Sequence, residues 1–387
     1  MDLMGFARTE LQKEVVKLRE EGVSWNDIAH KQSRADRDVR RSYETVLARA
    51  ALKGFSPDHD MSHTVPDPFV VKGVSTYYND EGKPVGQWVK SSVEDERKKK
   101  IMEAFVDSLA EDIKPAKPVK LSKAPREENL LNTYILTDYH IGMLAWGEET
   151  GDDWDIDIAE RTLISWFKKG IELSPKADTA VFAQIGDLMH FDSYTPVTVA
   201  SGHILDADSR LQKIIRCVIR VTRTIIDMLL SKYKHVHIKW CDANHDPASA
   251  AWMREFLVSF YEKEPRVDVD NSPDTYYCYE WGKVALFFHH GHKRKVSNVD
   301  TVFAGKFREI FGRTKYNYAH MGHYHSIDVK ETNLMVVSQH RTLAAPDAYA
   351  AKGGYISGRD SVVITYHKDY GEVSRQTISY KLVSDER

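Results

Sequence analysis

The chain has 387 residues, a formal net charge of −3 and 42% hydrophobic residues. This length allows two or three domains with a large core, and the near-neutral charge excludes an overall field that favours nucleic acid, so any basic surface must be local. The three dispersed cysteines exclude a disulfide framework and a zinc ribbon. No signal peptide and no membrane span is visible, so we expect a cytoplasmic protein.

Residues 1–54 predict a small helical domain. Leu11, Val15 and Leu18 give the first helix one apolar face. Ser24 is a suitable N-cap for a short helix over residues 25–30, and a longer helix is expected over residues 36–52.

This order of helices is typical of a helix-turn-helix of the homeodomain-like kind, in which the third helix enters the major groove of DNA. Its candidate DNA contacts are Arg37, Arg40 and Arg41. The alternative is a docking or dimerisation module, because Asp36 and Asp38 leave this helix only weakly basic.

Residues 55–113 predict an accessory region, a β-hairpin with its turn at residues 79–82 followed by an amphipathic helix over residues 93–113. Residues 114–127 then form a linker whose first thirteen positions, KPAKPVKLSKAPR, hold prolines and cations but no acid. Such a segment could follow a phosphate backbone, or it could be a solvated spacer.

Residues 128–387 predict the catalytic domain. Strands alternate with helices expected over residues 156–173, 205–233 and 248–262, and hairpins follow. This order favours an α/β fold in which two mixed sheets pack face to face with helices outside, a four-layer αββα sandwich.

Five short fragments carry metal-ligand chemistry, and most of them follow an apolar strand. In the first, Asp138 and His140 are two positions apart, so on extended chain they point to the same side. His323 and His325 repeat this spacing in the last fragment. In order, the fragments are TDYHIG from Thr137, GDLMH from Gly186, NHD from Asn244, HHGH from His289 and GHYH from Gly322.

This ordered set resembles the calcineurin-like metallophosphoesterase superfamily over about residues 131–345. TDYHIG and GDLMH look most like the SbcD and Mre-type DNA-repair nucleases. Ala243 departs from the pattern, since the family usually has glycine before the asparagine. The αββα sandwich is also the fold that the resemblance implies.

The resemblance implies two divalent metal ions bound by side chains of the five fragments. Nitrogen and oxygen ligands without cysteine favour Mn²⁺, with Fe, Zn or Mg as alternatives. The resemblance assigns Asp138, His140 and His325 to one ion, Asn244, His290 and His323 to the other, and Asp187 to both. The strand pattern by itself leaves the choice between His289 and His290 open, since both faces are apolar.

The resemblance also implies catalytic roles for three residues. His245 would protonate the leaving oxygen, with Asp246 orienting its ring, and His190 would orient the scissile phosphate. The alternatives are that His245 binds phosphate as a cation and that His190 packs locally.

Three segments beside the site are candidates for substrate contact. Residues 191–210 form a long loop in which His203 and Arg210 could meet substrate, and His292 could also do so. Lys293 and Arg294 belong to the best basic cluster near the site, which could hold DNA or be a solvated loop.

We therefore expect a two-metal phosphodiester hydrolase, specifically a DNA exonuclease or endonuclease that uses a metal-activated hydroxide as nucleophile. The alternatives are a phosphatase or small-nucleotide phosphodiesterase with the same site, and a non-catalytic DNA-binding protein. The resemblance implies a role in DNA repair, dimers and a coiled-coil ATPase partner, but no C-terminal helical docking segment for an ATPase is visible. The combination with the N-terminal module resembles phage-encoded phosphoesterases, which act in the host cytoplasm.

Overall fold

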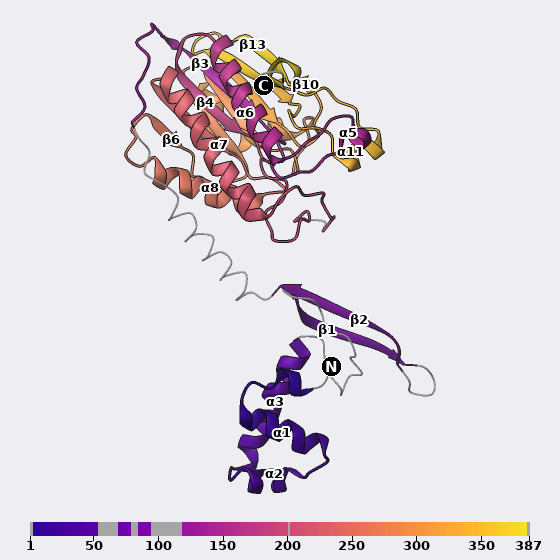
Figure 1. Ribbon diagram of the computed structural model, residues 1–387. Coiled ribbons are helices and arrows are strands. Elements are labelled where there is room, and N and C mark those ends of the chain that lie inside the picture. The colour runs from indigo at the N-terminus through magenta and orange to yellow at the C-terminus, as the bar shows by residue number, and fades with distance from the viewer. Residues whose placement is uncertain (1–2, 53–68, 79–83, 94–117, 200–201, 385–387) are drawn as a thin grey trace. The chain divides into compact units, whose positions relative to one another are not determined.

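The computed structural model describes residues 3–52, 69–78, 84–93, 118–199 and 202–384 (Figure 1). The chain divides into two compact units, Met1–Ile113 and Lys114–Arg387. The amphipathic helix predicted over residues 93–113 lies outside the described residues, apart from its first position, and so does the start of the predicted linker.

In the first unit, three helices pack through fully buried Val15, Ile28 and Val39. The hydroxyl of Ser24 accepts a hydrogen bond from the backbone N–H of Asp27, so the predicted N-cap is confirmed. The helical elements are η1 (Leu3–Phe6), α1 (Glu10–Glu20), α2 (Trp25–Lys31) and α3 (Asp36–Leu52).

The predicted hairpin of the first unit is also confirmed. Strands β1 (Phe69–Tyr78) and β2 (Pro84–Val93) pair antiparallel along their whole length. The register shifts twice, between Val71 and Gly73 and again near the turn, which is typical of β-bulges.

The second unit contains a six-stranded sheet in the order β13-β12-β3-β4-β5-β6. Strands β3 to β6 run parallel, and β12 and β13 add an antiparallel edge. The strands are β3 (Glu127–Leu136), β4 (Ala177–Gln184), β5 (His235–Trp240), β6 (Val267–Val269), β12 (Asp360–His367) and β13 (Gly371–Ser379).

A second, five-stranded sheet has the order β10-β11-β9-β8-β7. Its central strands β8, β9 and β11 are parallel, and the outer strands β7 and β10 are antiparallel to their neighbours. The strands are β7 (Tyr277–Trp281), β8 (Val284–Phe288), β9 (Tyr316–Met321), β10 (Asp328–Glu331) and β11 (Val336–Gln339).

The main core lies between the two sheets. Ile135 and Val181 of the first sheet share a buried cluster with Leu286 and Phe288 of the second. Helices α9 (Val299–Lys306) and α10 (Arg308–Arg313) contribute to a separate cluster on the other face of the second sheet. Helices α6 (Ile156–Leu173), α7 (Leu211–Lys232) and α8 (Pro247–Phe260) cover the first sheet (Figure 1). The predicted four-layer αββα sandwich is therefore confirmed.

Helix α7 differs from its prediction at one end. The sequence predicts a helix over residues 205–233, but α7 begins at Leu211. The residues before Leu211 form hydrogen bonds with the segment that follows β3 instead. In one of them, the backbone N–H of Asp208 donates to the carbonyl of Gly142 at 3.0 Å. These tertiary hydrogen bonds replace the first turns of the expected helix.

Three short helices complete the unit: α5 (Gly147–Thr150), α11 (Ala348–Gly353) and α12 (Lys381–Ser384). None of the helices in the described part of the chain is long and apolar enough to cross a membrane. The features that matter for function are the carboxyl ends of β3, β4, β5, β8 and β9, where parallel strands of both sheets end.

Candidate metal centre

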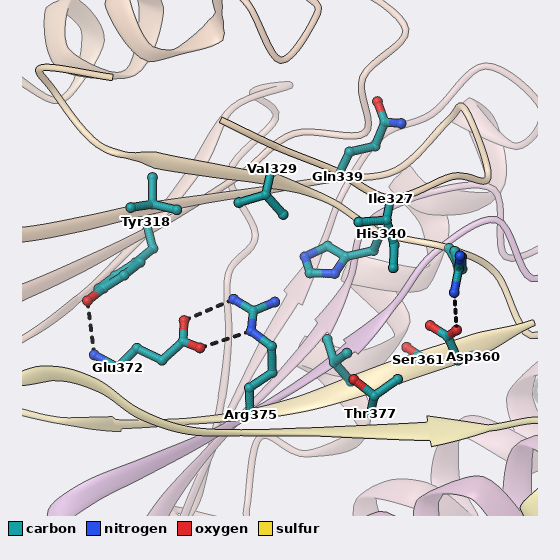
Figure 2. Close-up of a pocket in the computed structure, with 13 residues that line it drawn as sticks. Tyr318, Ile327, Val329, Gln339, His340, Asp360, Ser361, Glu372, Arg375 and Thr377 are labelled. Atoms are coloured by element: carbon teal, nitrogen blue, oxygen red, sulfur yellow. Dashed lines mark hydrogen bonds and ion pairs between the residues drawn. The ribbon is translucent and has the colours of Figure 1, made fainter. Parts of the chain in front are cut away.

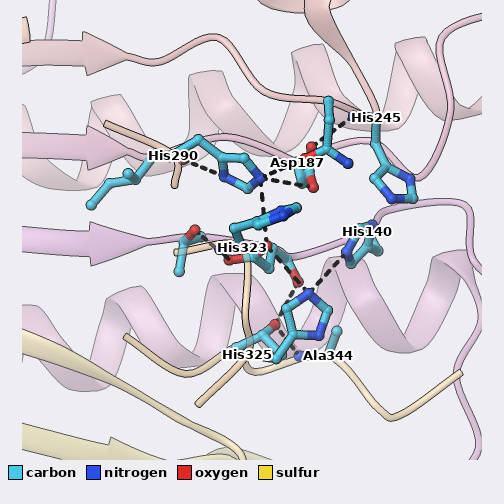
Figure 3. Close-up of polar contacts among 12 residues, drawn as sticks. His140, Asp187, His245, His290, His323, His325 and Ala344 are labelled. Carbon is cyan, nitrogen blue, oxygen red and sulfur yellow. Dashed lines mark hydrogen bonds and ion pairs between the residues drawn. The ribbon is translucent and has the colours of Figure 1, made fainter. Parts of the chain in front are cut away.

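The seven predicted metal ligands lie just beyond the carboxyl ends of these five strands. Asp138 and His140 follow β3, Asp187 follows β4, and Asn244 follows β5. From the second sheet, His290 follows β8, while His323 and His325 follow β9. Figure 3 shows that the labelled side chains of this set point toward one another. The fold therefore brings together residues that are up to 187 positions apart, from 138 to 325.

Two groups of these ligands have the geometry of a metal site. The ligand atoms of Asp138, His140 and His325 all lie within 4.8 Å of one another, and so do those of Asp187, His290 and His323. The amide oxygen of Asn244 lies 3.0 Å from Nε2 of His290, which adds an oxygen donor to the second group. A further contact joins the groups, because His290 Nε2 lies 3.9 Å from Asp138 Oδ1.

The backbone at these ligands is strained. The described residues include six non-glycine positions with positive φ, and Ser33 is the one that lies outside the site. The other five are Asp138, His140, Asp187, His323 and His325, with φ between 50° and 73°. Each such residue costs on the order of 1–3 kcal/mol, and strain of this kind concentrates at functional sites. The strain indicates that the ligand positions are held for function.

Close packing behind the ligands requires glycine at Gly186, immediately before Asp187. Its φ is +103°, and an added Cβ would lie 2.6 Å from the Cβ of Ala243 and 2.7 Å from Nδ1 of His290. Ala243, which departs from the family pattern, is thus accommodated because its neighbour Gly186 has no side chain.

The electrostatics of the buried carboxylates point to a cation. Burial raises the pKa of Asp187, but the opposing effect of His290 is stronger overall and holds that pKa well below its usual range. Burial likewise lowers the pKa of His290, yet Asp187 and Asp138 together raise it to about 9. The site thus attracts positive charge, and among the described residues both carboxylates form ion pairs with histidines alone.

The residues present therefore fit divalent metal ions. Ring nitrogens and carboxylate oxygens face one another without a lysine or arginine between them, and Nε2 of His140 is 3.4 Å from Nε2 of His325. Converging lone pairs of this kind are satisfied by a shared cation. The donors are nitrogen and oxygen, which suits Mn, Fe, Zn or Mg.

The structure distinguishes between the two adjacent histidines after β8. His290 has its Nε2 3.0 Å from Oδ2 of Asp187, inside the site. The side chain of His289 points away from the site. Its Nδ1 donates to the carbonyl of Thr275 at 3.0 Å, and its ring stacks on Tyr276. His292 lies beside the site, with its ring centroid 5.5 Å from that of His290.

His245 lies at the edge of the metal centre. Its Nδ1 bonds to the carbonyl oxygen of His190 at 2.8 Å, and its backbone N–H donates to Oδ1 of Asp187 at 2.9 Å. A ring that donates from Nδ1 has Nε2 left to exchange a proton. Ligand atoms of His140, His190 and His245 also lie within 4.8 Å of one another, so the ring belongs to the site.

One predicted role is wrong. Asp246 does not orient the ring of His245, because its carboxylate accepts hydrogen bonds from the backbone N–H groups of Asp187, at 3.2 Å, and Met189, at 2.9 Å. The carbonyl of His190 takes that role instead. Asp246 thus braces the loop that carries Asp187.

His190 is buried between the other histidines. Its Nδ1 lies 3.3 Å from Nδ1 of His140, and its ring stacks on that of His245. Burial, followed by the nearby His245, lowers the pKa of His190 to about 3, so its ring is neutral near neutral pH.

One residue that supports the metal centre could not be recognised from the sequence. Thr342, in the loop after β11, donates a hydrogen bond of 2.6 Å from its hydroxyl to the carbonyl oxygen of Asp138. This contact fixes the strained backbone of a ligand from a position about two hundred residues away in the chain.

The predicted DNA contacts occupy different settings. Lys293 and Arg294 are exposed in the loop after His292, beside the metal centre. In the first unit, Arg37 and Arg41 are exposed on α3, whereas Arg40 pairs with Asp36 at 2.7 Å.

A cavity of about 510 Å³ lies between the edges of the two sheets (Figure 2). Both arginines in its lining are neutralised there. Arg375 pairs with Glu372 at 2.9 Å, and Arg341 pairs with Asp360 at 2.8 Å. Gln339, from the same lining, donates to the carbonyl of Ser326, next to the candidate ligand His325.

No protein-family model and no curated protein sequence matches the chain. Solved structures that align with it include a predicted phosphoesterase from Streptococcus pneumoniae, with 10% identity over 66% of this chain and 99% of that one, at a TM-score of 0.26. Vps29 with Zn²⁺ from Entamoeba histolytica has 8% identity over 65% and 99%, at 0.28. An archaeal phosphodiesterase has 12% identity over 65% and 99%, at 0.30. Because these TM-scores are low, the function of the chain is inferred from the geometry of its own site.

Proposed function

We propose that this chain is a metal-dependent phosphodiester hydrolase with DNA as its substrate. The observation that carries the proposal is the convergence of two buried carboxylates, Asp138 and Asp187, with four histidine rings and an amide oxygen at the strand ends of both sheets. The chain uses strained backbone to hold this arrangement, which a purely structural cluster does not require.

The donor set would hold two divalent ions, most suitably Mn²⁺. Asp138, His140 and His325 would bind one ion, and His290, His323 and Asn244 would bind the other, with Asp187 shared. When bound, such ions supply Lewis-acid stabilisation of the phosphoryl oxygens and lower the pKa of water to near neutrality.

The remaining chemistry belongs to residues of the chain. His245 is oriented through Nδ1 by the His190 carbonyl, so that its Nε2 can pass a proton to the leaving oxygen as a phosphodiester is cleaved. His190, neutral and buried, maintains the relative positions of His140 and His245. These two histidines therefore have different tasks, proton transfer and positioning.

Local basic features support DNA as the substrate. Lys293 and Arg294 are exposed beside the site, and residues 118–126 of the basic segment carry Lys120, Lys123 and Arg126. Arg126 is engaged with Asp178 at 3.1 Å, which leaves the two lysines for a phosphate backbone. The three-helix first unit, with its exposed Arg37 and Arg41, suits DNA contact by α3.

The test is Mn²⁺-dependent cleavage of labelled single-stranded, duplex and hairpin DNA. The wild type is compared with Asp187→Ala and with the matched control Asp268→Ala, an exposed carboxylate on β6. We expect the wild type and Asp268→Ala to cleave DNA and Asp187→Ala to be inactive. Turnover of bis-p-nitrophenyl phosphate or nucleotides without DNA cleavage would move the assignment to a small-nucleotide phosphodiesterase.

A further inference from the structure

A second cavity is lined by a chain segment that begins directly after the metal-centre residue His190. It has a volume of about 660 Å³ and is lined by residues of the loop 191–210 and of the first turn of α7. Cavities of roughly 300–1,000 Å³ accommodate small molecules or single groups of a larger ligand.

The cavity is built on the two segments that carry metal-centre histidines. Its lining begins at Phe191, the residue after His190. On the other side, the backbone N–H of Asp208 donates to the carbonyl of Gly142, two residues beyond His140. The cavity is therefore joined to the metal centre through the backbone on both of its sides, which makes it the candidate position for a group attached to a phosphate at that centre.

The lining carries free positive charge. Arg210 and Lys213 are exposed, and neither forms an ion pair within the part of the chain that the structure describes. The one carboxylate of the lining, Asp208, is engaged, because its Oδ2 accepts from the backbone N–H of Ile156 at 3.0 Å and from Ser209 at 3.2 Å. The cavity of Figure 2 differs in this respect, since each of its arginines is paired with a carboxylate.

The lining also offers an aromatic surface. The side chain of Tyr194 is 46% exposed, and its hydroxyl accepts a hydrogen bond from Nε2 of Gln212 at 3.2 Å. This bond ties the ring to the first turn of α7, next to Lys213. An aromatic face beside two cations is the combination that binds one base and its phosphate in single-stranded nucleic acids.

We propose that this cavity binds the unpaired nucleotide next to the scissile phosphate, with its base on Tyr194 and its phosphate at Arg210 and Lys213. This proposal rests on the proposed function, and it specifies the substrate as a single strand or a frayed end. A base inside a duplex is stacked on both faces by its neighbours, so it has no free face for Tyr194.

The experiment uses a single variant, Tyr194→Leu, and a double variant that combines Arg210→Glu with Lys213→Glu. Lys330→Glu is the control. The control makes the same kind of charge change on β10, at the edge of the other sheet. For each protein, kcat/KM is measured with Mn²⁺ on a short single-stranded oligonucleotide and on bis-p-nitrophenyl phosphate, which has no neighbouring nucleotide. We expect kcat/KM on the oligonucleotide, divided by kcat/KM on bis-p-nitrophenyl phosphate, to fall about tenfold or more in both variants. The same ratio should stay constant in the control.

A second measurement keeps the inference independent of catalysis. Dissociation constants for a fluorescent single-stranded oligonucleotide and for its blunt duplex are determined by anisotropy at several salt concentrations. We expect the charge variant to bind the single strand about tenfold more weakly, with a salt slope reduced by about 0.7 for each phosphate that the variant no longer neutralises. Unchanged ratios and unchanged single-strand affinity would overturn the inference. A wild type that binds the strand in this way but hydrolyses neither substrate would overturn the proposed function alone.

Discussion

At the scale of single residues, the metal centre depends on backbone conformations that its side chains do not favour. Asp138 and His140 both have positive φ, and hydrogen bonds from distant segments hold them in place. The backbone N–H of His323 donates to both carboxylate oxygens of Asp138, at 3.0 and 2.8 Å, and Thr342 bonds to its carbonyl. The surrounding fold thus determines the ligand geometry, at a cost in stability.

Gly322→Ala should destabilise the chain by about 2 kcal/mol or more, because overpacked buried positions carry costs of this size. An added Cβ at Gly322 would overlap the hydroxyl of Thr137 and the carboxylate of Asp138. Urea unfolding measures the change in free energy. Gly305→Ala in α9 is the matched control, since its Cβ would meet no atom within 4 Å, and it should leave stability unchanged or improved.

His245→Gln should lower kcat by roughly 10²- to 10⁴-fold on a substrate with an alkoxide leaving group, because this group can no longer receive a proton from the enzyme. The decrease should be much smaller with a p-nitrophenolate leaving group, which needs no proton. Steady-state kinetics on the two substrates, together with the metal content of the variant, check this. Equal decreases on both substrates would contradict the role in proton transfer.

At the scale of secondary-structure elements, the strands that precede the site could be predicted from apolar runs in the sequence. The hairpin of β12 and β13 and helix α6 were also within reach of pattern and propensity. The start of α7 was not, because backbone hydrogen bonds between residues far apart in the chain decide it. Similarly, strand alternation could not choose between His289 and His290, which depends on how β8 faces β4.

The position of Asp246 beside His245 in the sequence was misleading for a related reason. Neighbouring side chains in a loop diverge, so the carboxylate faces the backbone of Asp187 and the imidazole faces that of His190. The second cavity likewise depends on the tertiary path of the loop, although Arg210 was a candidate substrate contact from sequence.

Helix α8 should depend on one buried cation. Arg254 donates to the carbonyl of Trp240 at 3.0 Å, to Oδ1 of Asp242 at 2.6 Å and to the hydroxyl of Tyr277 at 3.0 Å. It thus ties α8 to the end of β5, just before Asn244. Arg254→Ala should destabilise the chain by about 2 kcal/mol or more, since it removes three hydrogen bonds of a buried side chain and leaves the partly buried carboxylate of Asp242 unpaired.

Urea unfolding of Arg254→Ala and of Lys169→Ala makes the comparison. Lys169 forms an exposed pair with Glu172 on α6 and should contribute little to stability. Similar stabilities for the two variants would show that Arg254 does not anchor α8.

At the scale of the whole molecule, the chain combines a first unit of helices and a hairpin with a sandwich unit, each with its own core. If the first unit delivers DNA, then full-length Arg37→Glu with Arg41→Glu should bind duplex DNA more weakly, with a salt slope reduced by about 0.9 for each phosphate that is no longer neutralised. Anisotropy titrations at several salt concentrations measure both quantities. Lys13→Glu on α1 serves as the charge control, and equally weakened binding in the two variants would speak against contact through α3.

If the strand ends of the two sheets form one site for two ions, with Asp187 as a ligand of both, the chain should bind two divalent ions. The most direct measurement is the metal stoichiometry of the purified chain after Mn²⁺ loading, by calorimetric titration and elemental analysis, in the wild type, Asp187→Ala and Asp268→Ala. We expect two ions per chain in the wild type and in Asp268→Ala, and fewer than two in Asp187→Ala. Failure of the wild type to bind Mn²⁺, Fe²⁺, Zn²⁺ or Mg²⁺, or full binding by Asp187→Ala, would rule out a two-ion site built on Asp187.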